Sequence, residues 1–345
     1  MTERLTLSID AMGGDSAPDM VVEGINIALS QLNNVQFMLF GDQARLQPLL
    51  DHFPKAQQAC QVIHTDDIVT NQEKPGIALR TGRQSSMRLA INAVGDGLAD
   101  GIVSSGNTGA LMAMAKFVLK TLPGISRPAI ASFLPTMRNG SVMLDLGANI
   151  SCDADNLVQF AVMGEVFARN MLKIEKPTVG ILNVGQEVLK GNDAVKQAAA
   201  ILSETHLPLD YYGFIEGDDI AKGTVDVIVT DGFTGNIALK TAEGTARLFG
   251  HYLRKSLTST LFSKLGALLS KNALREFKEK VDPRRYNGAM FLGLNGICIK
   301  SHGGTDAIGF ANAIQVAHDL IKSSLNENIK NDYAKLTDEF GDDLL

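Results

Sequence analysis

The sequence has no tryptophan, only three cysteines and no apolar run long enough to cross a membrane. A membrane-spanning helix needs roughly 18 or more apolar residues in a row, so any membrane contact is expected to be peripheral. Cys60, Cys152 and Cys298 lie far apart, in or beside apolar stretches and in no CxxC pair. This pattern predicts reduced thiols in a cytoplasmic protein, with no disulfide or metal role. The first ten residues lack a basic segment followed by an apolar one, so no signal peptide is expected.

An excess of positive charge is also missing. The 345 residues include 32 Lys and Arg against 38 Asp and Glu, which gives a net charge of −6. Affinity for nucleic acid comes mainly from neutralising phosphates with Lys and Arg, so general nucleic-acid binding is not expected. Hydrophobic residues make up 45% of the chain, which is enough for the large buried core of a globular protein.

Several catalytic signatures are absent. The sequence contains no GxxxxGK[ST], no GxSxG and no HExxH, and the turn after the first expected strand reads Ala11-Met-Gly-Gly-Asp15 where a dinucleotide fingerprint would read GxGxxG. The six histidines show no metal-ligand spacing. We therefore expect no metal and no cofactor. A reaction in which an anionic substrate is itself the nucleophile needs none of these groups, only positioning and charge stabilisation.

Short apolar runs alternate with amphipathic segments along most of the chain. Strands are expected near residues 4–10, 35–40, 60–64, 100–104, 130–134, 141–145, 178–183, 209–215, 225–230 and 296–300. Helices are expected near 17–32, 43–51, 76–97, 107–121, 154–172, 192–204 and 305–325. The alternation predicts a three-layer α/β/α sandwich with a mostly parallel sheet. Because no linker or repeat interrupts it, residues 1–325 are expected to form a single composite domain.

Residues 254–280 depart from this alternation, because leucines recur at helical spacing with no strand between them. The pattern predicts an inserted, protruding helical hairpin over about residues 254–281, with one apolar stripe. Residues 254–280 include seven basic and two acidic residues, an excess of five positive charges in an acidic chain. Two interpretations remain open: the stripe packs on the core or on a second subunit, or the hairpin faces a partner protein or a membrane.

The chain ends in an acidic segment. From Asn326 to Leu345, acidic residues outnumber lysines. We expect residues 326–345 to form an acidic, solvated tail with a frayed end.

Turns rich in Gly and Asn follow many of the expected strands. Asp231-Gly-Phe-Thr-Gly-Asn236 connects the apolar run 225–230 to a helical pattern, and two glycines there let the backbone turn sharply and approach a ligand. Similar turns are Asp10–Asp15, Ser104–Ala110, Asp145–Asn149, Asn183–Glu187 and Ser301–Asp306. If all strands are parallel, these turns lie at one edge of the sheet and form one anion-accepting cleft.

Together these motifs resemble those of the bacterial phosphate acyltransferases, the PlsX family. The matching stretches are DAMGGD, SSGNTGA, LDLGAN, NVGQEVLKGN, DGFTGN and KSHGG, in order from Ile9 to about Leu320. The resemblance implies that acyl-acyl-carrier-protein and inorganic phosphate are converted to acyl phosphate, on a route to phosphatidic acid. It also implies a fold similar to phosphotransacetylases, a homodimer and a peripheral link to the membrane glycerol-3-phosphate acyltransferase that uses the product.

The same resemblance identifies site residues. It implies that Lys190 and Asn236 are the catalytic pair, the first supplying a positive charge and the second an amide hydrogen bond. The expected phosphate-binding turn comprises Gly106, Asn107, Thr108 and Gly109. Further expected substrate-binding residues are Asp10, Gly13, Gly14, Asn149, Asp231, Gly235 and His302. For His302, a structural role and a proton-transfer role both remain open.

Two other functions compete with this interpretation. One is a phosphotransacetylase that uses small acyl-CoA thioesters, and the other is a non-catalytic anion-binding module that docks a partner through the hairpin. The first requires a nucleotide pocket and a short acyl pocket, whereas the second binds phosphate without turnover.

Overall fold

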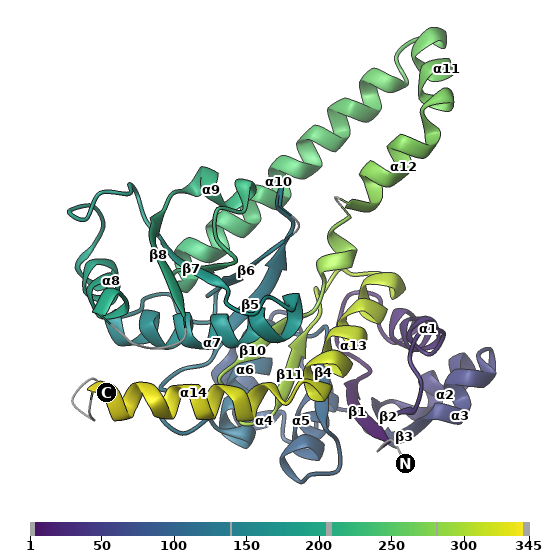
Figure 1. Cartoon of the computed structure of the whole chain (residues 1–345). Helices are drawn as coiled ribbons and strands as arrows, with labels where there is room; N and C mark the ends of the chain where they lie inside the picture. The colour runs from purple at the N-terminus through teal and green to yellow at the C-terminus, as the bar shows by residue number, and fades with distance from the viewer. Residues whose placement is uncertain (1–3, 139, 205–208, 281, 341–345) are drawn as a thin grey trace.

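The computed structural model describes residues 4–138, 140–204, 209–280 and 282–340, and all of its named strands form one eleven-stranded sheet (Figure 1). The strand order is β3-β2-β1-β4-β11-β10-β5-β6-β9-β7-β8. The strands are β1 Leu5–Asp10, β2 Val35–Gly41, β3 Cys60–His64, β4 Gly101–Ser104, β5 Ala129–Leu134, β6 Ser141–Leu144, β7 Thr178–Leu182, β8 Asp210–Ile215, β9 Val227–Val229, β10 Ala289–Leu292 and β11 Ile297–Lys300.

Helices connect the strands and cover both faces of the sheet. They are α1 Asp19–Ala28, α2 Gln43–Asp51, α3 Pro54–Ala59, α4 Pro75–Thr81, α5 Ser86–Gly95, α6 Thr108–Leu119, α7 Ala154–Leu172, α8 Asp193–Glu204, α9 Gly217–Lys222, α10 Gly232–Leu257, α11 Leu261–Leu269, α12 Lys271–Lys280, α13 Ala307–Lys322 and α14 Leu325–Phe340. One buried cluster joins the sheet to α1, α7, α8 and α13, and a second joins it to α4, α5 and α6. The expected α/β fold is therefore confirmed, with apolar layers on both sides of the sheet.

The sheet is mostly parallel, as expected, but its two halves run in opposite directions. β10 pairs antiparallel with both β11 and β5, and β5 pairs antiparallel with β6. β3, β2, β1, β4 and β11 are parallel to one another, as are β6, β9, β7 and β8. Hence the turns after β1, β4 and β11 leave one edge, and those after β6, β9 and β7 leave strands of opposite direction. The expectation that all the Gly/Asn turns share one edge is wrong, because β5 and β6 pair antiparallel and β6, β9, β7 and β8 therefore run opposite to β11.

Some element boundaries also differ from the sequence-based prediction. The single helix expected over residues 76–97 is two helices, α4 and α5, separated at Gly82, whose N–H bonds to the carbonyl of Ala78 at the end of α4. Ser85 then caps α5, its Oγ accepting from the N–H of Arg88 at 3.3 Å. A Gly at a helix end followed by a Ser cap is a stop and a start signal, and here it outweighs the continuous apolar periodicity.

The helical hairpin begins earlier than expected. α10 runs without a break from Gly232 to Leu257, and Figure 1 shows α10 and α12 as the two sides of an arm that projects from the body of the protein, with α11 at its tip. We call residues 244–280 the arm. No residue of α11 is buried, and Leu261, Phe262 and Leu269 are each more than 80% exposed. The apolar stripe of the arm therefore does not pack on the core of its own chain.

The expected acidic tail is largely helical. α14 extends from Leu325 to Phe340 and lies along α7 (Figure 1), with Leu325, Ile329 and Tyr333 buried. Gln159 Nε2 donates to the hydroxyl of Tyr333 at 3.2 Å. The prediction of a frayed end from Asn326 is thus wrong up to Phe340, because an apolar stripe at i, i+4 and i+8 buries the helix despite its charge. Residues 341–345 lie outside the described residues.

None of the described helices is both long enough and apolar enough to span a bilayer. The strongly apolar helix α11 has only nine residues, well below the roughly 20 that a crossing requires.

Candidate functional site

Three strands of the first half of the sheet end side by side in register. Asp10 at the end of β1 pairs with Ser104 at the end of β4, and Ser104 pairs with Lys300 at the end of β11. Residues in register on neighbouring strands point to the same face, so a buried acid, a hydroxyl and a buried amine form one row. The loops that follow these three strands make up what we call the first loop group.

Asp10 anchors this row. It is 1% exposed and accepts hydrogen bonds from Ser86 Oγ and Ser104 Oγ, each at 2.7 Å. Burial raises the pKa of the Asp10 carboxyl, and the hydrogen bonds oppose that rise. With its oxygens occupied by the two serines, Asp10 holds the start of α5 and the end of β4 in place. The expected substrate-binding residue Asp10 therefore lies beneath the loops.

Glycines let the three loops of the first group pack closely. A β-carbon on Gly13 would lie 2.7 Å from the amide nitrogen of Gly106, and one on Gly14, which has φ +108°, would lie 2.9 Å from Ser105 Cβ. The N–H of Asp15 donates to the carbonyl of Gly303 at 2.9 Å. The structure thus brings together Gly13, Gly14 and Gly106, as the sequence predicted, and no side chain fits at these contacts.

Lys300 is the most unusual charged residue of the group, because it is only 9% exposed. Its Nζ donates to the backbone carbonyls of Ser105, at 3.4 Å, and of Ser301. Burial lowers the pKa of Lys300 to about 8, and the negative charges of Asp10 and Asp15 oppose this shift. An amine in this position can bind an anion at neutral pH and lose its charge only slightly above it.

The hydroxyl of Ser105 lies buried beside these groups. The side chain has no exposed surface, and its Oγ has no hydrogen-bond partner among the described residues. Buried hydroxyls in proteins are almost always hydrogen-bonded, so this hydroxyl is available to a group from outside the described chain, such as a ligand oxygen.

The first turn of α6 supplies backbone N–H groups. Asn107 caps this helix, because its Oδ1 accepts from the N–H of Ala110 at 3.1 Å, and its Nδ2 donates to the carbonyls of Thr70, Asn71 and Glu73. The expected phosphate ligand Asn107 therefore holds the loop before α4 with its side chain. The N–H groups of Thr108 and Gly109 have no hydrogen-bond partner in the described part of the chain, and they lie where an anion is favoured by the helix dipole.

His302 extends from the loop after β11. Its ring Nδ1 accepts from the N–H of Gly304 at 3.2 Å, which places the proton of the neutral ring on Nε2. Burial, followed by the charge of Lys240 on α10, lowers the pKa of His302. The ring is therefore neutral at physiological pH and offers Nε2–H as a hydrogen-bond donor.

The second loop group follows β6 and β9. Asp145, which has no exposed surface, accepts five hydrogen bonds, from the N–H groups of Ile130, Gly147, Ala148 and Asn149 and from Asn149 Nδ2. Asn149 Nδ2 also donates to the carbonyl of Pro128 at 2.8 Å. Both amide hydrogens of Asn149 are thus used within the protein, and Asp145 organises a turn that the sequence identified only as a motif.

The first turn of α10 packs on the turn after β6 at Gly232 and Gly235. A β-carbon on Gly232 would lie 2.5 Å from the carbonyl oxygen of Asn149. Asp231 caps α10, with Oδ1 accepting from the N–H of Thr234 at 2.8 Å and Oδ2 from its hydroxyl at 2.9 Å. The expected ligand Asp231 is therefore a helix cap.

Asn236 lies in the first turns of α10 with its side chain exposed. Its Nδ2 donates to the carbonyl of Leu146 at 3.0 Å, which fixes the orientation of the amide. An amide nitrogen has two hydrogens, so one remains for a ligand. The geometry thus provides one oriented donor at the positive end of a 26-residue helix.

Lys190 lies on the exposed loop after β7. β7 is the neighbour of β9, and Ile181 pairs with Val229, so this loop leaves the sheet next to the one that carries Asp231 and Asn236. The Lys190 side chain is exposed and forms no hydrogen bond or ion pair among the residues described. The loop itself is held by Asn183 Nδ2, which donates to the carbonyls of Gly185 and Lys190 at 3.1 Å.

α10 connects the two loop groups electrostatically. Lys240 follows Asn236 by four residues, so both lie on one face of α10. Its charge contributes to lowering the pKa of both Lys300 and His302. The candidate site is therefore the region where this face of α10 lies within electrostatic range of the first loop group.

Three residues of this site were not predicted as site residues from the sequence: Lys240, Lys300 and Ser105. Lys300 and Ser105 lie within the KSHGG and SSGNTGA motifs, so the motifs themselves were a signal for them. Lys240 could have been identified from its i+4 spacing to Asn236.

The described residues also include one group of metal-ligand type, at the carboxyl ends of β2 and β3. Asp42, His64 and Asp66 place their ligand atoms within 4.8 Å of one another. His64 Nδ1, however, accepts from the N–H of Gln43 at 3.2 Å, so in the neutral ring Nε2 carries the proton and cannot bind a metal. Burial raises the pKa of Cys60 and of Cys152 to about 12, so neither is an activated thiol.

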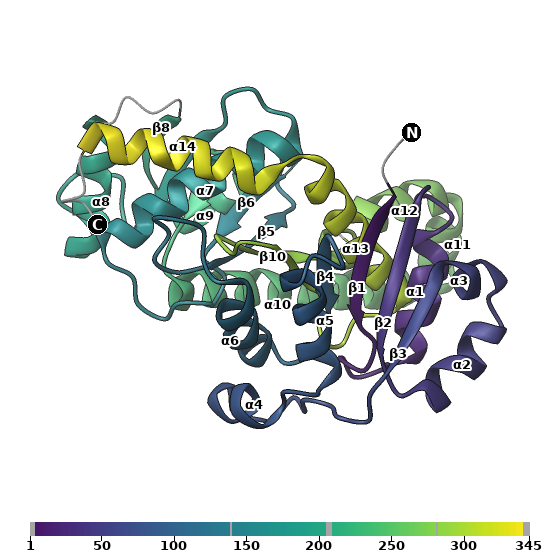
Figure 2. The same cartoon turned by 90° about the horizontal axis from the view of Figure 1, so that it is seen from below.

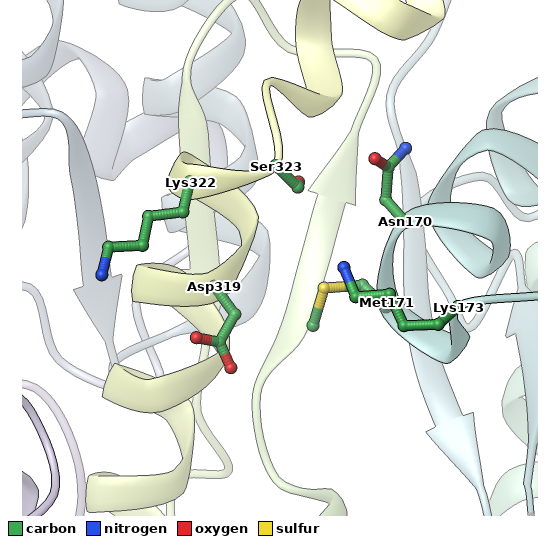
Figure 3. Close-up of a pocket in the computed structure, with 6 residues that line it drawn as sticks. All are labelled: Asn170, Met171, Lys173, Asp319, Lys322 and Ser323. Carbon is green, nitrogen blue, oxygen red and sulfur yellow. The ribbon is translucent and has the colours of Figure 1, made fainter.

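A groove of about 360 Å³ lies at the carboxyl ends of α7 and α13. It is lined by Asn170, Met171 and Lys173 from one side and Asp319, Lys322 and Ser323 from the other, and Figure 3 shows the Lys322 side chain pointing away from Asn170 and Met171. α13 has 16 residues, a length of about 24 Å, and its other end carries the loop with His302. The groove is therefore distant from the candidate site.

Comparisons with known proteins agree with this geometry. The family model "Fatty acid synthesis protein" matches residues 5–328. A phosphate acyltransferase from Rhodospirillum centenum is 61% identical over 97% of the chain and 95% of the relative, and one from Paramagnetospirillum magneticum is 57% identical over 97% and 96%.

Solved structures show the same fold at low identity. The EutD phosphotransacetylase from Staphylococcus aureus has a TM-score of 0.59 at 17% identity, covering 94% of both chains. A phosphotransacetylase from Streptococcus pyogenes has a TM-score of 0.61 at 17% identity, covering 93% of this chain and 95% of that one. Because the family model covers residues 5–328 and these relatives are 57% and 61% identical over 97% of the chain, the chain belongs to the phosphate acyltransferases, the PlsX family, and is an enzyme of that class.

Proposed function

We propose that the enzyme transfers a long-chain acyl group from acyl-acyl-carrier-protein to inorganic phosphate, in phospholipid (phosphatidic acid) synthesis. An oxygen of hydrogenphosphate attacks the thioester carbonyl, a C–O bond forms, and the C–S bond breaks. The proton of the phosphate passes to the leaving thiolate, so acyl phosphate and the free carrier thiol result. A thiol with a pKa of about 8.5 leaves readily, and no covalent enzyme intermediate is needed.

The observation that best supports this mechanism is the orientation of Asn236. One of its amide hydrogens is held by the carbonyl of Leu146, and the other is available at the start of α10. A fixed donor at a helix N-terminus stabilises the oxyanion that develops on the carbonyl, because it does not reorganise during the reaction. Asn236 thus binds the transition state more strongly than the substrate.

Phosphate binding is assigned to positive and N–H groups of the first loop group and of the loop after β7. Lys300, the unpaired Ser105 hydroxyl and the free N–H groups of Thr108 and Gly109 offer hydrogen bonds to phosphate oxygens. Lys190 supplies a further charge from the neighbouring loop, since its exposed amine has no competing carboxylate among the described residues. Neutral His302 adds the Nε2–H donor.

One assay separates this function from the alternative acyl donor. Purified protein is incubated with phosphate and either palmitoyl-acyl-carrier-protein or palmitoyl-CoA, and acyl phosphate is measured. We expect kcat/KM to be at least tenfold higher with the carrier protein. Preference for a short acyl-CoA would instead favour a phosphotransacetylase. The non-catalytic anion-binding module is set aside, because the chain belongs to an enzyme family.

We also propose a cytoplasmic homodimer that associates peripherally with the membrane through its arm. The exposed apolar residues of α11 and the positive charge excess of the arm suit an anionic lipid surface. Apolar side chains on α10, among them Leu248, Phe249 and Tyr252, are more than half exposed and suit the second subunit. Membrane contact would place the acyl phosphate next to the membrane glycerol-3-phosphate acyltransferase that uses it.

A further inference from the structure

Basic residues are concentrated in one stretch that the mechanism above does not use. Residues 74–144 contain eight Lys and Arg but only two acidic residues, Asp96 and Asp100, in a chain with a net charge of −6. Both acids follow the carboxyl end of α5, and Asp100 Oδ2 accepts from the N–H of Thr6 at 2.7 Å. Helices α4, α5 and α6 and the turn between the first two contain no Asp or Glu.

These helices form one surface. α4 and α5 both pack against α6, and Figure 2 shows the three helices next to one another. What we call the basic face consists of Lys74, Arg80, Arg83, Arg88 and Lys116. None of the five forms an ion pair with another described residue, and all except the half-buried Arg88 are exposed.

Arg88 and an aromatic ring lie at the centre of the basic face. The guanidinium carbon of Arg88 lies 5.1 Å from the centroid of the Phe117 ring on α6, and the like charge of Arg83 acts on Arg88. Phe117 is 63% exposed, and Ile77 on α4 is 44% exposed. Arginines and aromatic side chains are enriched at protein interfaces, and a cluster of unneutralised positive charges favours an acidic partner.

The basic face begins beside the candidate site. Asn107 Nδ2 holds the loop before α4, and a β-carbon on Gly109 would lie 2.7 Å from Pro75 Cγ, so the start of α4 lies against the first turn of α6. Ser86, the first residue of α5, donates to Asp10. A partner bound on this face therefore lies next to the first loop group. A flexible prosthetic group carried by that partner can reach the proposed phosphate position.

We propose that the basic face is the docking surface for the acyl carrier protein, an acidic partner that presents its thioester on a flexible prosthetic group. The inference rests on the proposed function, in which the acyl donor is a carrier thioester. The protruding arm of this enzyme suits that partner less well, because α11 exposes five large apolar side chains, Leu261, Phe262, Leu265, Leu268 and Leu269. The two positively charged surfaces thus have separate partners: the carrier binds the basic face, and lipid binds the arm.

The test compares two double charge reversals that change the net charge equally. Arg80→Glu/Arg83→Glu alters exposed residues of the basic face, and Lys55→Glu/Lys176→Glu alters exposed lysines elsewhere. Each variant and the wild type are assayed with palmitoyl-acyl-carrier-protein and with palmitoyl-pantetheine, which has no protein to dock. We expect KM for the carrier substrate to rise at least tenfold only in the basic-face variant, with kcat/KM for palmitoyl-pantetheine within about twofold of wild type.

The outcomes distinguish the docking proposal from the proposed function. A wild-type enzyme that gives no acyl phosphate from the carrier thioester overturns the proposed function. An active wild type with an unchanged KM in the basic-face variant overturns the docking surface alone. An equal rise in the Lys55/Lys176 variant, or an equal loss with palmitoyl-pantetheine, also overturns it, because the effect then comes from net charge or from the site. Arg83→Lys, which keeps the charge, should retain the wild-type KM.

Discussion

Gly235 on α10 lies so close to the carbonyl oxygen of Asp145 that a β-carbon on this glycine would be 1.9 Å from that oxygen. No backbone oxygen tolerates such a contact, so the close approach of α10 to the turn after β6 depends on glycine. That approach also lets Asn236, one residue later, donate to the carbonyl of Leu146. The position of the proposed catalytic amide is therefore set by a glycine that has no chemistry of its own.

Gly235→Ala should destabilise the protein by about 3 kcal/mol and lower kcat, because backbone must move to admit the methyl group. Gly244→Ala is the matched control on the same helix, since a β-carbon there meets nothing within 4 Å. Helix propensity alone predicts that the control gains up to about 1 kcal/mol. Thermal and urea unfolding of both variants measure the difference. Equal stability of the two would show that the helix shifts freely at this contact.

Asn236→Ala and Lys190→Ala should each lower kcat by about 10²–10³, the usual effect of losing one donor to a developing oxyanion. Circular dichroism should show an intact fold, because both side chains are exposed. The prediction is measured as initial rates at saturating phosphate and acyl-carrier protein. A variant with near wild-type kcat but a raised KM for phosphate would assign that residue to ground-state binding only.

The affinity for phosphate should fall above pH 8. Burial lowers the pKa of Lys300 to about 8 in the folded protein, so the amine loses its proton as the pH rises through that value. Each further pH unit reduces the charged fraction about tenfold, and KM for phosphate should rise in proportion. Asp10 and Asp15 favour the charged amine, and Lys240 opposes it.

Lys300→Arg provides the control for this pH dependence, because guanidinium keeps its charge. Its KM for phosphate should stay flat from pH 8 to 9.5, whereas Lys300→Met should show a high and flat KM. The contribution of Lys300 to stability changes with pH in the opposite direction to its contribution to phosphate affinity. The unfolded state binds more protons between about pH 8 and the ordinary lysine pKa, so the contribution of Lys300 to unfolding free energy increases with pH in that interval. A wild-type KM that does not change above pH 8 would contradict a role for the charged amine.

Turnover should need neither a thiol nor a metal. Burial raises the pKa of all three cysteines, to about 12 for Cys60 and Cys152, which leaves very little thiolate near pH 7. A Cys60→Ser/Cys152→Ser/Cys298→Ala variant should keep kcat within about threefold, and activity should survive chelator. Loss of activity in chelator that one metal ion restores would contradict this mechanism.

The sequence predicted local structure well where one signal acted alone. The helix expected over residues 154–172 has those bounds, because its apolar pattern begins directly after a cap, Asp153, and continues on both sides of the buried Gly164. The four-residue strand β10 escaped notice because its apolar run is short and surrounded by loops. The direction of half the sheet was predicted wrongly for another reason: β5 and β6 pair antiparallel, and strand direction is a non-local property that no single segment encodes.

The candidate site, too, could be predicted from the sequence only in part. Each Gly/Asn turn was recognisable from the sequence, but which turn lies near which depends on the three antiparallel pairs β11–β10, β10–β5 and β5–β6. Asn107 and Asp231 read equally well as ligands or caps, and only their hydrogen bonds show that both cap helices. Lys300 was overlooked because burial of a lysine cannot be read from a strand that ends in Ile-Lys.

The arm leads to the last prediction, which concerns lipid. Its tip exposes Leu261, Phe262 and Leu269 almost completely. Exposed lysines lie beside them, Lys264 on α11 and Lys271 and Lys278 on α12. An apolar tip flanked by lysines can insert into the headgroup region while the lysines contact anionic lipid. Burial against a second subunit would account for the leucines but not for the excess of positive charge.

Lys264→Glu/Lys271→Glu/Lys278→Glu should therefore release the enzyme from phosphatidylglycerol vesicles while kcat in solution stays within about twofold. Leu261→Ser/Phe262→Ser should do the same without changing the charge, since it removes the apolar insertion. Wild-type binding should weaken with salt, because exposed charges are screened over roughly 10 Å at 0.1 M ionic strength. Vesicle co-sedimentation measures binding, with the Lys55→Glu/Lys176→Glu variant and neutral phosphatidylcholine vesicles as controls. If both arm variants keep their vesicle binding while gel filtration shows dissociation of a dimer, the tip is an assembly element and the lipid assignment is wrong.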